Sequence, residues 1–288
     1  MAGHTKNAGG FRAAVVQLRS GRDPDRNVAA AADLIRAAAA DGAQYIQTPE
    51  NTCLMELDKA RIARELKPEK NNSAIAAFSS IARDSAVWLH IGSVGIKLDD
   101  GRFANRSYLF APNGDIAARY DKIHMFDVDL GNGEVYRESA SYAAGTSAVL
   151  TDLPWGPLGL TICYDLRFPQ LHRALAHAGA RFIASPAAFT RVTGEAHWHT
   201  LLKARAIETQ CFIFAAAQGG RHENGRETFG HSLIISPWGQ VLAEAGKEPG
   251  FVAADIDLEL LEDVRRRLPS LTHDRHFHVS PAPAKKRV

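Results

Sequence analysis

The chain has 288 residues, of which 45% are hydrophobic and 23% charged, values that are ordinary for a globular protein with one large core. Its formal net charge of +2 is spread along the sequence, which excludes the basic field of a nucleic-acid-binding protein and favours a small-molecule substrate. Three scattered cysteines and the lack of an apolar run of about 18 residues exclude a disulfide framework and a membrane span, so we expect a cytoplasmic protein.

The first half of the chain alternates between strand and helix patterns. Residues 11–18 form an apolar strand pattern, and Asp23-Pro24 then predicts a capped helix that ends near Gly42. Four segments follow in the order strand, helix, helix, strand: residues 43–48, 56–67, 72–85 and 87–97. Turn signals then separate two strands of a meander, residues 103–111 and 115–122.

The second half begins with an irregular stretch over residues 126–145. Five segments follow in the order strand, helix, strand, helix, strand: residues 158–163, 169–178, 181–185, 196–209 and 211–218. Two short strands, residues 231–236 and 240–244, flank a turn at Pro237-Trp238-Gly239, and a last helical pattern ends at Arg265-Arg266-Arg267. The alternation predicts an α/β fold of mixed sheets covered by helices.

The chain shows no linker and no repeat. We therefore predict one domain over residues 11–280, with flexible tails at residues 1–10 and 281–288.

Three reactive side chains stand at predicted strand ends, where open α/β proteins place their chemistry. Glu50 and Lys122 follow two early strands, and Cys163 ends the run Leu-Gly-Leu-Thr-Ile. A thiol that hydrolyses an amide needs a base for its proton and a positive group near the developing oxyanion. Of the other cysteines, Cys53 is interpreted as a bystander near Glu50 and Cys211 as a core residue.

Three segments carry a resemblance to a known family. Thr48-Pro49-Glu50, Asp121-Lys122-Ile123-His124-Met125-Phe126-Asp127 and Ile162-Cys163-Tyr164-Asp165-Leu166-Arg167-Phe168-Pro169 resemble the signature segments of the nitrilase superfamily of carbon–nitrogen hydrolases, and the similarity extends over residues 11–270. Ala196-His197-Trp198, Gly230-His231-Ser232 and residues 203–211 and 218–222 resemble the Nit-type amidase branch, in particular deaminated-glutathione amidases. Thr48 departs from the leucine that the family usually has there.

The resemblance implies a four-layer αββα sandwich and a homodimer or higher homo-oligomer without a cofactor. It also implies that Cys163 is the nucleophile and Glu50 the general base. Lys122 would stabilise the tetrahedral intermediate together with the backbone N–H of Tyr164. The family's second glutamate corresponds to Glu138, with Glu134 as the rival in a variable loop.

The substrate that the resemblance implies is a small carboxylate-bearing amide, cleaved through a cysteine acyl-enzyme with release of ammonia. Deaminated glutathione is the first choice, and the ω-amides 2-oxoglutaramate and 2-oxosuccinamate are the second. An N-carbamoyl compound, a nitrile and a catalytically silent interaction protein stay open as alternatives. Tyr164, Phe189, Arg191 and Thr193, in loops near Cys163, are the candidates for substrate binding.

The histidines predict no metal site. His197 and His199 are two residues apart at a predicted helix start, where their side chains diverge. His222 and His231 flank a loop that we interpret as solvated, and the group His273, His276 and His278 lacks a fourth ligand. No glycine-rich phosphate loop is present, so no nucleotide cofactor is expected.

Overall fold

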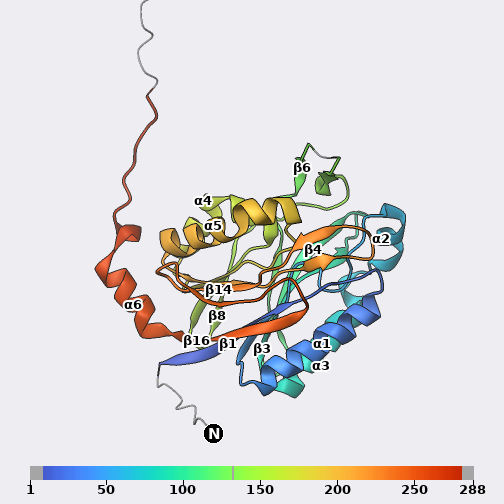
Figure 1. Cartoon of the computed structure of the whole chain (residues 1–288), viewed down its shortest axis with the longest axis horizontal. Coiled ribbons are helices and arrows are strands. Elements are labelled where there is room, and N and C mark those ends of the chain that lie inside the picture. The colour runs from blue at the N-terminus through green and yellow to red at the C-terminus, as the bar shows by residue number, and fades with distance from the viewer. Residues whose placement is uncertain (1–8, 132, 281–288) are drawn as a thin grey trace, which may run out of the picture.

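Two six-stranded mixed sheets pack face to face, and helices cover both outer surfaces (Figure 1). The computed structural model describes residues 9–131 and 133–280. The predicted tail at residues 281–288 lies outside the described residues, as do residues 1–8 of the other tail, and the first strand already begins at Gly10. In the described part of the chain, no helix has both the length and the apolar character of a membrane span.

The first sheet joins both ends of the chain. Its strand order is β16 (Gly250–Asp257), β1 (Gly10–Gln17), β2 (Tyr45–Gln47), β3 (Trp88–Lys97), β4 (Phe103–Phe110) and β5 (Ile116–Asp121). β1, β2 and β3 are parallel, whereas β16, β4 and β5 pair antiparallel with their neighbours. Helices α1 (Pro24–Ala40) and α3 (Ser73–Ser85) pack against its outer face (Figure 1).

The second sheet repeats this plan. Its strand order is β15 (Val241–Glu244), β14 (Leu233–Ile235), β11 (Phe212–Ala215), β10 (Phe182–Ala184), β9 (Gly156–Leu160) and β8 (Val149–Leu153). β9, β10 and β11 are parallel at its centre. Helices α4 (Pro169–His177) and α5 (Arg191–Thr209) cover it (Figure 1). The four-layer αββα sandwich implied by the resemblance is confirmed.

Strand periodicity explains how one sheet serves two cores. In β1, Ala13 and Val15 face the other sheet, whereas Ala14 and Val16 face α1 and α3. The outer core contains Ile35 of α1. Asp23 caps α1 as predicted, because its side chain accepts hydrogen bonds from two backbone N–H groups of the first turn.

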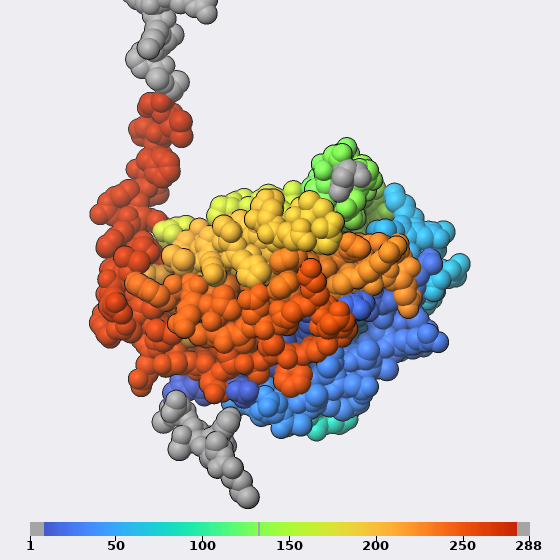
Figure 2. Space-filling view, viewed as in Figure 1, coloured from blue at the N-terminus to red at the C-terminus, as the bar shows by residue number. Residues whose placement is uncertain are grey.

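The remaining elements lie at the edges of the sandwich. They are helices α2 (Lys59–Glu65) and α6 (Leu258–Arg267), the hairpin of β6 (Asp127–Asp129) and β7 (Val135–Arg137), the hairpin of β12 (Gly219–Arg221) and β13 (Glu227–Phe229), and the 3-10 turns η1 (Glu69–Asn71), η2 (Glu138–Ala140), η3 (Cys163–Arg167) and η4 (Ser270–Thr272). The β6–β7 hairpin projects from the body of the molecule (Figure 2).

Several predictions of local structure were wrong or incomplete. The stretch predicted as irregular contains the β6–β7 hairpin and η2, and β16 had no predicted counterpart. Helix α5 begins at Arg191, five residues before the predicted start, because Thr190 caps it with its side chain. Cys163 lies outside the strand, in the first position of η3.

Candidate active site

The loop that carries Glu50 follows β2 and is held by hydrogen bonds within itself. The Thr52 hydroxyl donates to the Pro49 carbonyl at 2.7 Å, and the Thr48 hydroxyl contacts that of Thr52 at 2.8 Å. The Thr48 hydroxyl also accepts from the backbone N–H of Gly92 at 3.1 Å. Thr48, which departs from the family's leucine, therefore fixes this loop through hydrogen bonds.

Lys122 follows β5 and contacts two carboxylates. Its Nζ donates to Glu50 Oε1 at 2.8 Å and to Glu138 Oε1 and Oε2 at 3.1 and 2.9 Å. The Lys122 side chain is only 2% exposed, so the ammonium has exchanged water for these partners. Asn105 of β4 joins them, because its Nδ2 donates to both Glu50 and Glu138 at 3.0 and 3.1 Å.

Cys163 occupies a strained position. Its φ of 49° lies in the left-handed region, which residues other than glycine rarely adopt. The conformation is held because its N–H donates to the Pro186 carbonyl at 2.8 Å. The turn places the thiol in the cavity that Glu50 also lines, near enough for the negative charge of Glu50 to raise the pKa of the thiol.

Asp165 ties the cysteine turn to the lysine segment. Its carboxylate accepts from the Ile162 N–H at 2.9 Å, from the Tyr120 hydroxyl at 2.6 Å and from the His124 N–H at 3.1 Å. Tyr120 and His124 lie on either side of Lys122 in the chain. One fully buried carboxylate therefore fixes Cys163 and Lys122 relative to each other.

The electrostatics of the site define a resting state. Burial raises the pKa of Glu50, but Lys122, by its charge and its hydrogen bond, holds that pKa below its ordinary value. Burial lowers the pKa of Lys122, yet Glu138 and Glu50 raise it well above the usual value. Burial and the Glu50 charge raise the pKa of Cys163 well above that of a free thiol. At neutral pH the site therefore holds a carboxylate, an ammonium and a protonated thiol, and Glu50 can accept the thiol proton.

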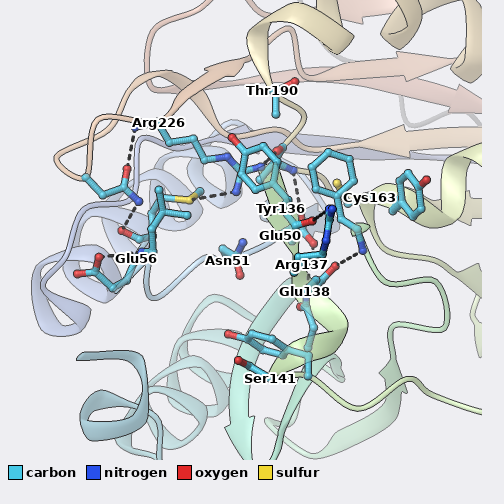
Figure 3. A pocket seen from close by; sticks show the side chains of 18 of the residues that line it. Glu50, Asn51, Glu56, Tyr136, Arg137, Glu138, Ser141, Cys163, Thr190 and Arg226 are labelled. Atoms are coloured by element: carbon cyan, nitrogen blue, oxygen red, sulfur yellow. Dashed lines mark hydrogen bonds between the residues drawn. The ribbon is translucent and has the colours of Figure 1, made fainter. Parts of the chain in front are cut away.

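A cavity of about 740 Å³ opens over these groups and is lined by Glu50, Lys122, Glu138 and Cys163 (Figure 3). Its size is typical of a small-molecule site. All four predicted reactive residues thus meet in one place. Glu134 also lines the cavity, but it accepts from the Tyr136 hydroxyl at 3.2 Å, whereas Glu138 contacts Lys122.

Three of the four predicted substrate-binding residues line this cavity, namely Tyr164, Phe189 and Thr193. Arg191 does not, and its prediction as a pocket residue is wrong. Its guanidinium donates to Glu227 at 2.9 Å and to Glu195 at 3.3 Å on the surface. Arg191 and Thr193 lie about 200° apart around the first turn of α5, so only Thr193 faces inward.

Sequence reasoning missed Arg226, Tyr136 and Asn105. Arg226 lies in the β12–β13 hairpin, the loop interpreted as solvated, and Tyr136 lies on β7 in the stretch interpreted as irregular. Asn105 lay inside a predicted strand, and alternation alone could not mark it as a site residue. His222, in the same loop, is buried. It is hydrogen-bonded to the Ser20 carbonyl at 2.8 Å and to the Thr228 hydroxyl at 2.7 Å.

Among the described residues, one group has metal-ligand spacing: His199, His231 and Glu244, whose ligand atoms lie within 4.8 Å of one another. Glu244 Oε1 hydrogen-bonds both imidazoles at 2.9 Å, which accounts for the group without an ion. None of the three lines the cavity.

Comparison with known proteins finds a family model and several amidases that are similar to this chain. The model of the carbon–nitrogen hydrolase family matches residues 12–266. A deaminated glutathione amidase of Yersinia enterocolitica is 41% identical over 269 residues, which cover 91% of this chain and 92% of that protein. Human omega-amidase NIT2 is 34% identical over 265 residues, which cover 92% of this chain and 95% of that protein.

The fold is also that of a solved relative. The Caenorhabditis elegans NitFhit protein superimposes with a TM-score of 0.86 at 34% identity. The alignment covers 93% of this chain and 65% of the NitFhit chain, so the present chain corresponds to one part of that longer protein.

Proposed function

The chain belongs to the carbon–nitrogen hydrolase family and is an enzyme of the amidase type, and we propose that Cys163 is the nucleophile that attacks its amide substrate. The observation that carries this proposal is that Glu50, a buried carboxylate bonded to the Lys122 ammonium, lines the same cavity as the Cys163 thiol. These are the nucleophile, base and cation that thiol-based amide hydrolysis needs.

The reaction proceeds in two halves. Glu50 takes the thiol proton while the sulfur attacks the amide carbon, and the oxyanion forms beside the Lys122 ammonium. The C–N bond breaks as Glu50 returns the proton to the leaving nitrogen, which leaves a thioester on Cys163. Glu50 then takes a proton from water, the hydroxide attacks the thioester, and the proton returns to the sulfur as the acid departs.

Glu138 acts in this scheme as a positioning residue for Lys122. It contacts Nζ with both carboxylate oxygens and also accepts from the Phe126 N–H at 2.7 Å. A well-aimed positive donor at the oxyanion contributes about 3 to 4 kcal/mol to the transition state, so its orientation matters as much as its charge.

The substrate that we propose first is deaminated glutathione, and an ω-amide of a 2-oxo acid is the second candidate. The Yersinia relative and human omega-amidase NIT2 support these two choices by their names. Both substrates yield a 2-oxo dicarboxylate, but the leaving nitrogen differs. An ω-amide releases ammonia, whereas deaminated glutathione releases the amine of cysteinylglycine. The ammonia expected from the sequence therefore applies to the ω-amide alone. The cavity of about 740 Å³ leaves room for the larger leaving group.

Release of the 2-oxo acid from both substrates tests this proposal. Wild-type enzyme is expected to form 2-oxoglutarate from deaminated glutathione and from 2-oxoglutaramate, with ammonia only from the latter. Cys163→Ala should be inert on both while it keeps the wild-type melting temperature. Turnover by that variant contradicts the mechanism, and carbon dioxide release from an N-carbamoyl amino acid in preference to both amides contradicts the substrate class.

A homodimer or larger homo-oligomer and a cytoplasmic location belong to the same proposal. The segment after α6 runs away from the body of the molecule (Figure 1), and its Phe277 and Val279 are 86% and 89% exposed. Apolar side chains this exposed favour contact with another copy of the chain. Analytical ultracentrifugation should give at least twice the monomer mass of 31.3 kDa.

A further inference from the structure

Arg226 projects into the catalytic cavity from the β12–β13 hairpin (Figure 3). The hairpin turn is fixed: the Asn224 side chain accepts from the Arg226 N–H at 3.0 Å and donates to the Met55 carbonyl at 3.1 Å. The base of the long side chain is thus held in place, and the guanidinium points toward the centre of the cavity.

The Arg226 guanidinium has no carboxylate partner among the described residues, unlike Arg191, Arg22 and Arg106, which all form ion pairs. One Nη donates to the Ala188 carbonyl at 2.5 Å, and the other contacts the Met55 sulfur at 3.9 Å. Its Nε is buried without any hydrogen-bond partner. A half-buried cation whose nearest partners are a carbonyl and a thioether gains from an anion that binds it.

The guanidinium also lies close to the reacting groups. The residue that accepts its hydrogen bond, Ala188, donates its N–H to Glu50 Oε2 at 3.0 Å. A single residue therefore separates the base from the guanidinium. The Cζ atom lies 5.2 Å from the centre of the Tyr136 ring, and this contact orients the guanidinium plane.

We propose that Arg226 forms an anion subsite that binds the carboxylate of the substrate's acyl half. This inference rests on the proposed amidase function. The acyl half is common to deaminated glutathione and 2-oxoglutaramate and carries a carboxylate a few bonds from the scissile carbonyl. A planar guanidinium that is not already paired with a carboxylate matches a substrate carboxylate in two parallel hydrogen bonds.

Arg167 is the rival cation of the cavity. Its two Nη atoms share the His197 Nδ1 at 3.3 Å, and its guanidinium lies 5.4 Å from the Phe189 ring centre. It packs on the side of the cavity formed by η3 and Phe189, whereas Ala188 links Arg226 directly to Glu50. The subsite beside Glu50 belongs to Arg226.

The test compares 2-oxoglutaramate with its methyl ester, in which the amide is unchanged and the carboxylate charge is absent. For wild-type enzyme we expect a higher kcat/KM on the acid. In Arg226→Met, which keeps the side-chain volume, the acid-to-ester ratio of kcat/KM should fall about 30- to 100-fold, mainly through KM, because a charged hydrogen bond is lost. Arg226→Lys should fall less. Arg191→Ala, which removes a surface arginine paired with the same hairpin, should keep the wild-type ratio.

The outcomes separate this inference from the proposed function. Equal losses on acid and ester in Arg226→Met indicate that Arg226 only supports Ala188 and Glu50, and this result overturns the subsite. Wild-type hydrolysis of the ester without preference for the acid keeps the amidase and also overturns the subsite. Failure of wild-type enzyme on both amides defeats the amidase function and the subsite with it.

A second measurement does not depend on a folded variant. Glutarate should inhibit wild-type enzyme at least tenfold more strongly than its dimethyl ester, because only the diacid carries the carboxylate that the subsite binds. Equal inhibition by the charged and uncharged compounds contradicts the subsite.

Discussion

The pKa of Glu50 is lowered and that of Cys163 is raised, so in the substrate-free enzyme the proton they share lies on the thiol. The carboxylate is ionised because Lys122 lowers its pKa, and the thiol stays protonated because burial and the Glu50 charge raise its pKa. The sulfur becomes nucleophilic only as the proton passes to Glu50, so the two residues act as a unit.

Glu138 gives a test at the scale of one residue. Glu138→Gln keeps the shape of the side chain but removes the charge that holds Lys122, so kcat is expected to fall about 10²-fold, the loss typical of a misdirected oxyanion donor. Glu134→Gln, the matched change at the rival glutamate, should reduce kcat far less. Steady-state kinetics of both variants distinguish them, and a larger loss in Glu134→Gln assigns the role to the rival.

The residues of the site differ in how well the sequence predicts them. Glu50, Lys122 and Cys163 follow apolar runs, so their placement at strand ends could be expected, and their meeting across the two sheets came from the resemblance. Arg226 could not be found, because nothing in a charged, glycine-rich loop indicates which side chain turns inward. Arg191 was placed in the pocket because the start of α5 was predicted five residues too late. In the observed helix Thr193 faces the cavity and Arg191 faces away from it.

At the scale of elements, the loop that carries Glu50 and the loop after β10, whose Pro186 carbonyl holds Cys163, meet over β3. A Cβ atom added at Gly92 would lie 2.2 Å from the Thr48 carbonyl oxygen and 2.5 Å from the Pro186 side chain. Thr48 precedes Pro49-Glu50, and the Pro186 carbonyl holds the Cys163 N–H. The strand pairing is irregular here, since the β3–β4 register shifts between Ile91 and Val94. Gly92 thus allows both loops to approach the same strand.

Gly92→Ala adds a single methyl group and is nevertheless expected to reduce activity strongly. Backbone atoms at 2.2 to 2.5 Å must move, and a shift of the base relative to the thiol should lower kcat at least tenfold and also lower the melting temperature. Gly246→Ala is the control, because an added Cβ there meets nothing within 4 Å. Wild-type kcat in Gly92→Ala would refute this account of the loop packing.

Elements with strong local signals were predicted well. Helices α1 and α3 carry side-chain caps and an apolar face, and β1 to β5 carry apolar runs between turn residues. The short strands of both hairpins were missed, since three residues show too little alternation to be recognised. The β1–β16 pairing joins Gly10 to Asp257, and such long-range contacts leave no trace in a local pattern.

At the scale of the whole molecule, three buried histidines link stability to pH. Burial lowers the pKa of His90 to about 3, of His172 to about 3 and of His222 to about 4, from a usual 6.5. His90 lies between the strands of the first sheet, bonded to Tyr45, Gln47 and Ser107. Below pH 6.5 the unfolded chain binds protons at these rings and the folded protein does not.

The contribution of these histidines to the free energy of unfolding is therefore fully present above pH 6.5, and it decreases as the pH drops toward 4. Each histidine contributes about 1.4 kcal/mol per pH unit, so the three together should cost about 4 kcal/mol between pH 7.5 and 5.5. Urea unfolding at the two pH values measures this difference. His172→Gln should reduce the pH dependence by about a third, and an unfolding free energy that stays constant over this range would contradict the neutral buried histidines.

The central claim is that Cys163 carries the acyl group during turnover. Wild-type enzyme mixed with 2-oxoglutaramate, quenched in acid within the first turnovers and digested, can be analysed by peptide mass spectrometry. We predict a 2-oxoglutaryl adduct on the peptide that contains Cys163, absent from the peptides of Cys53 and Cys211 and absent in Glu50→Gln. Product formation with the adduct on another cysteine, or undiminished turnover in Cys163→Ala, would contradict the account.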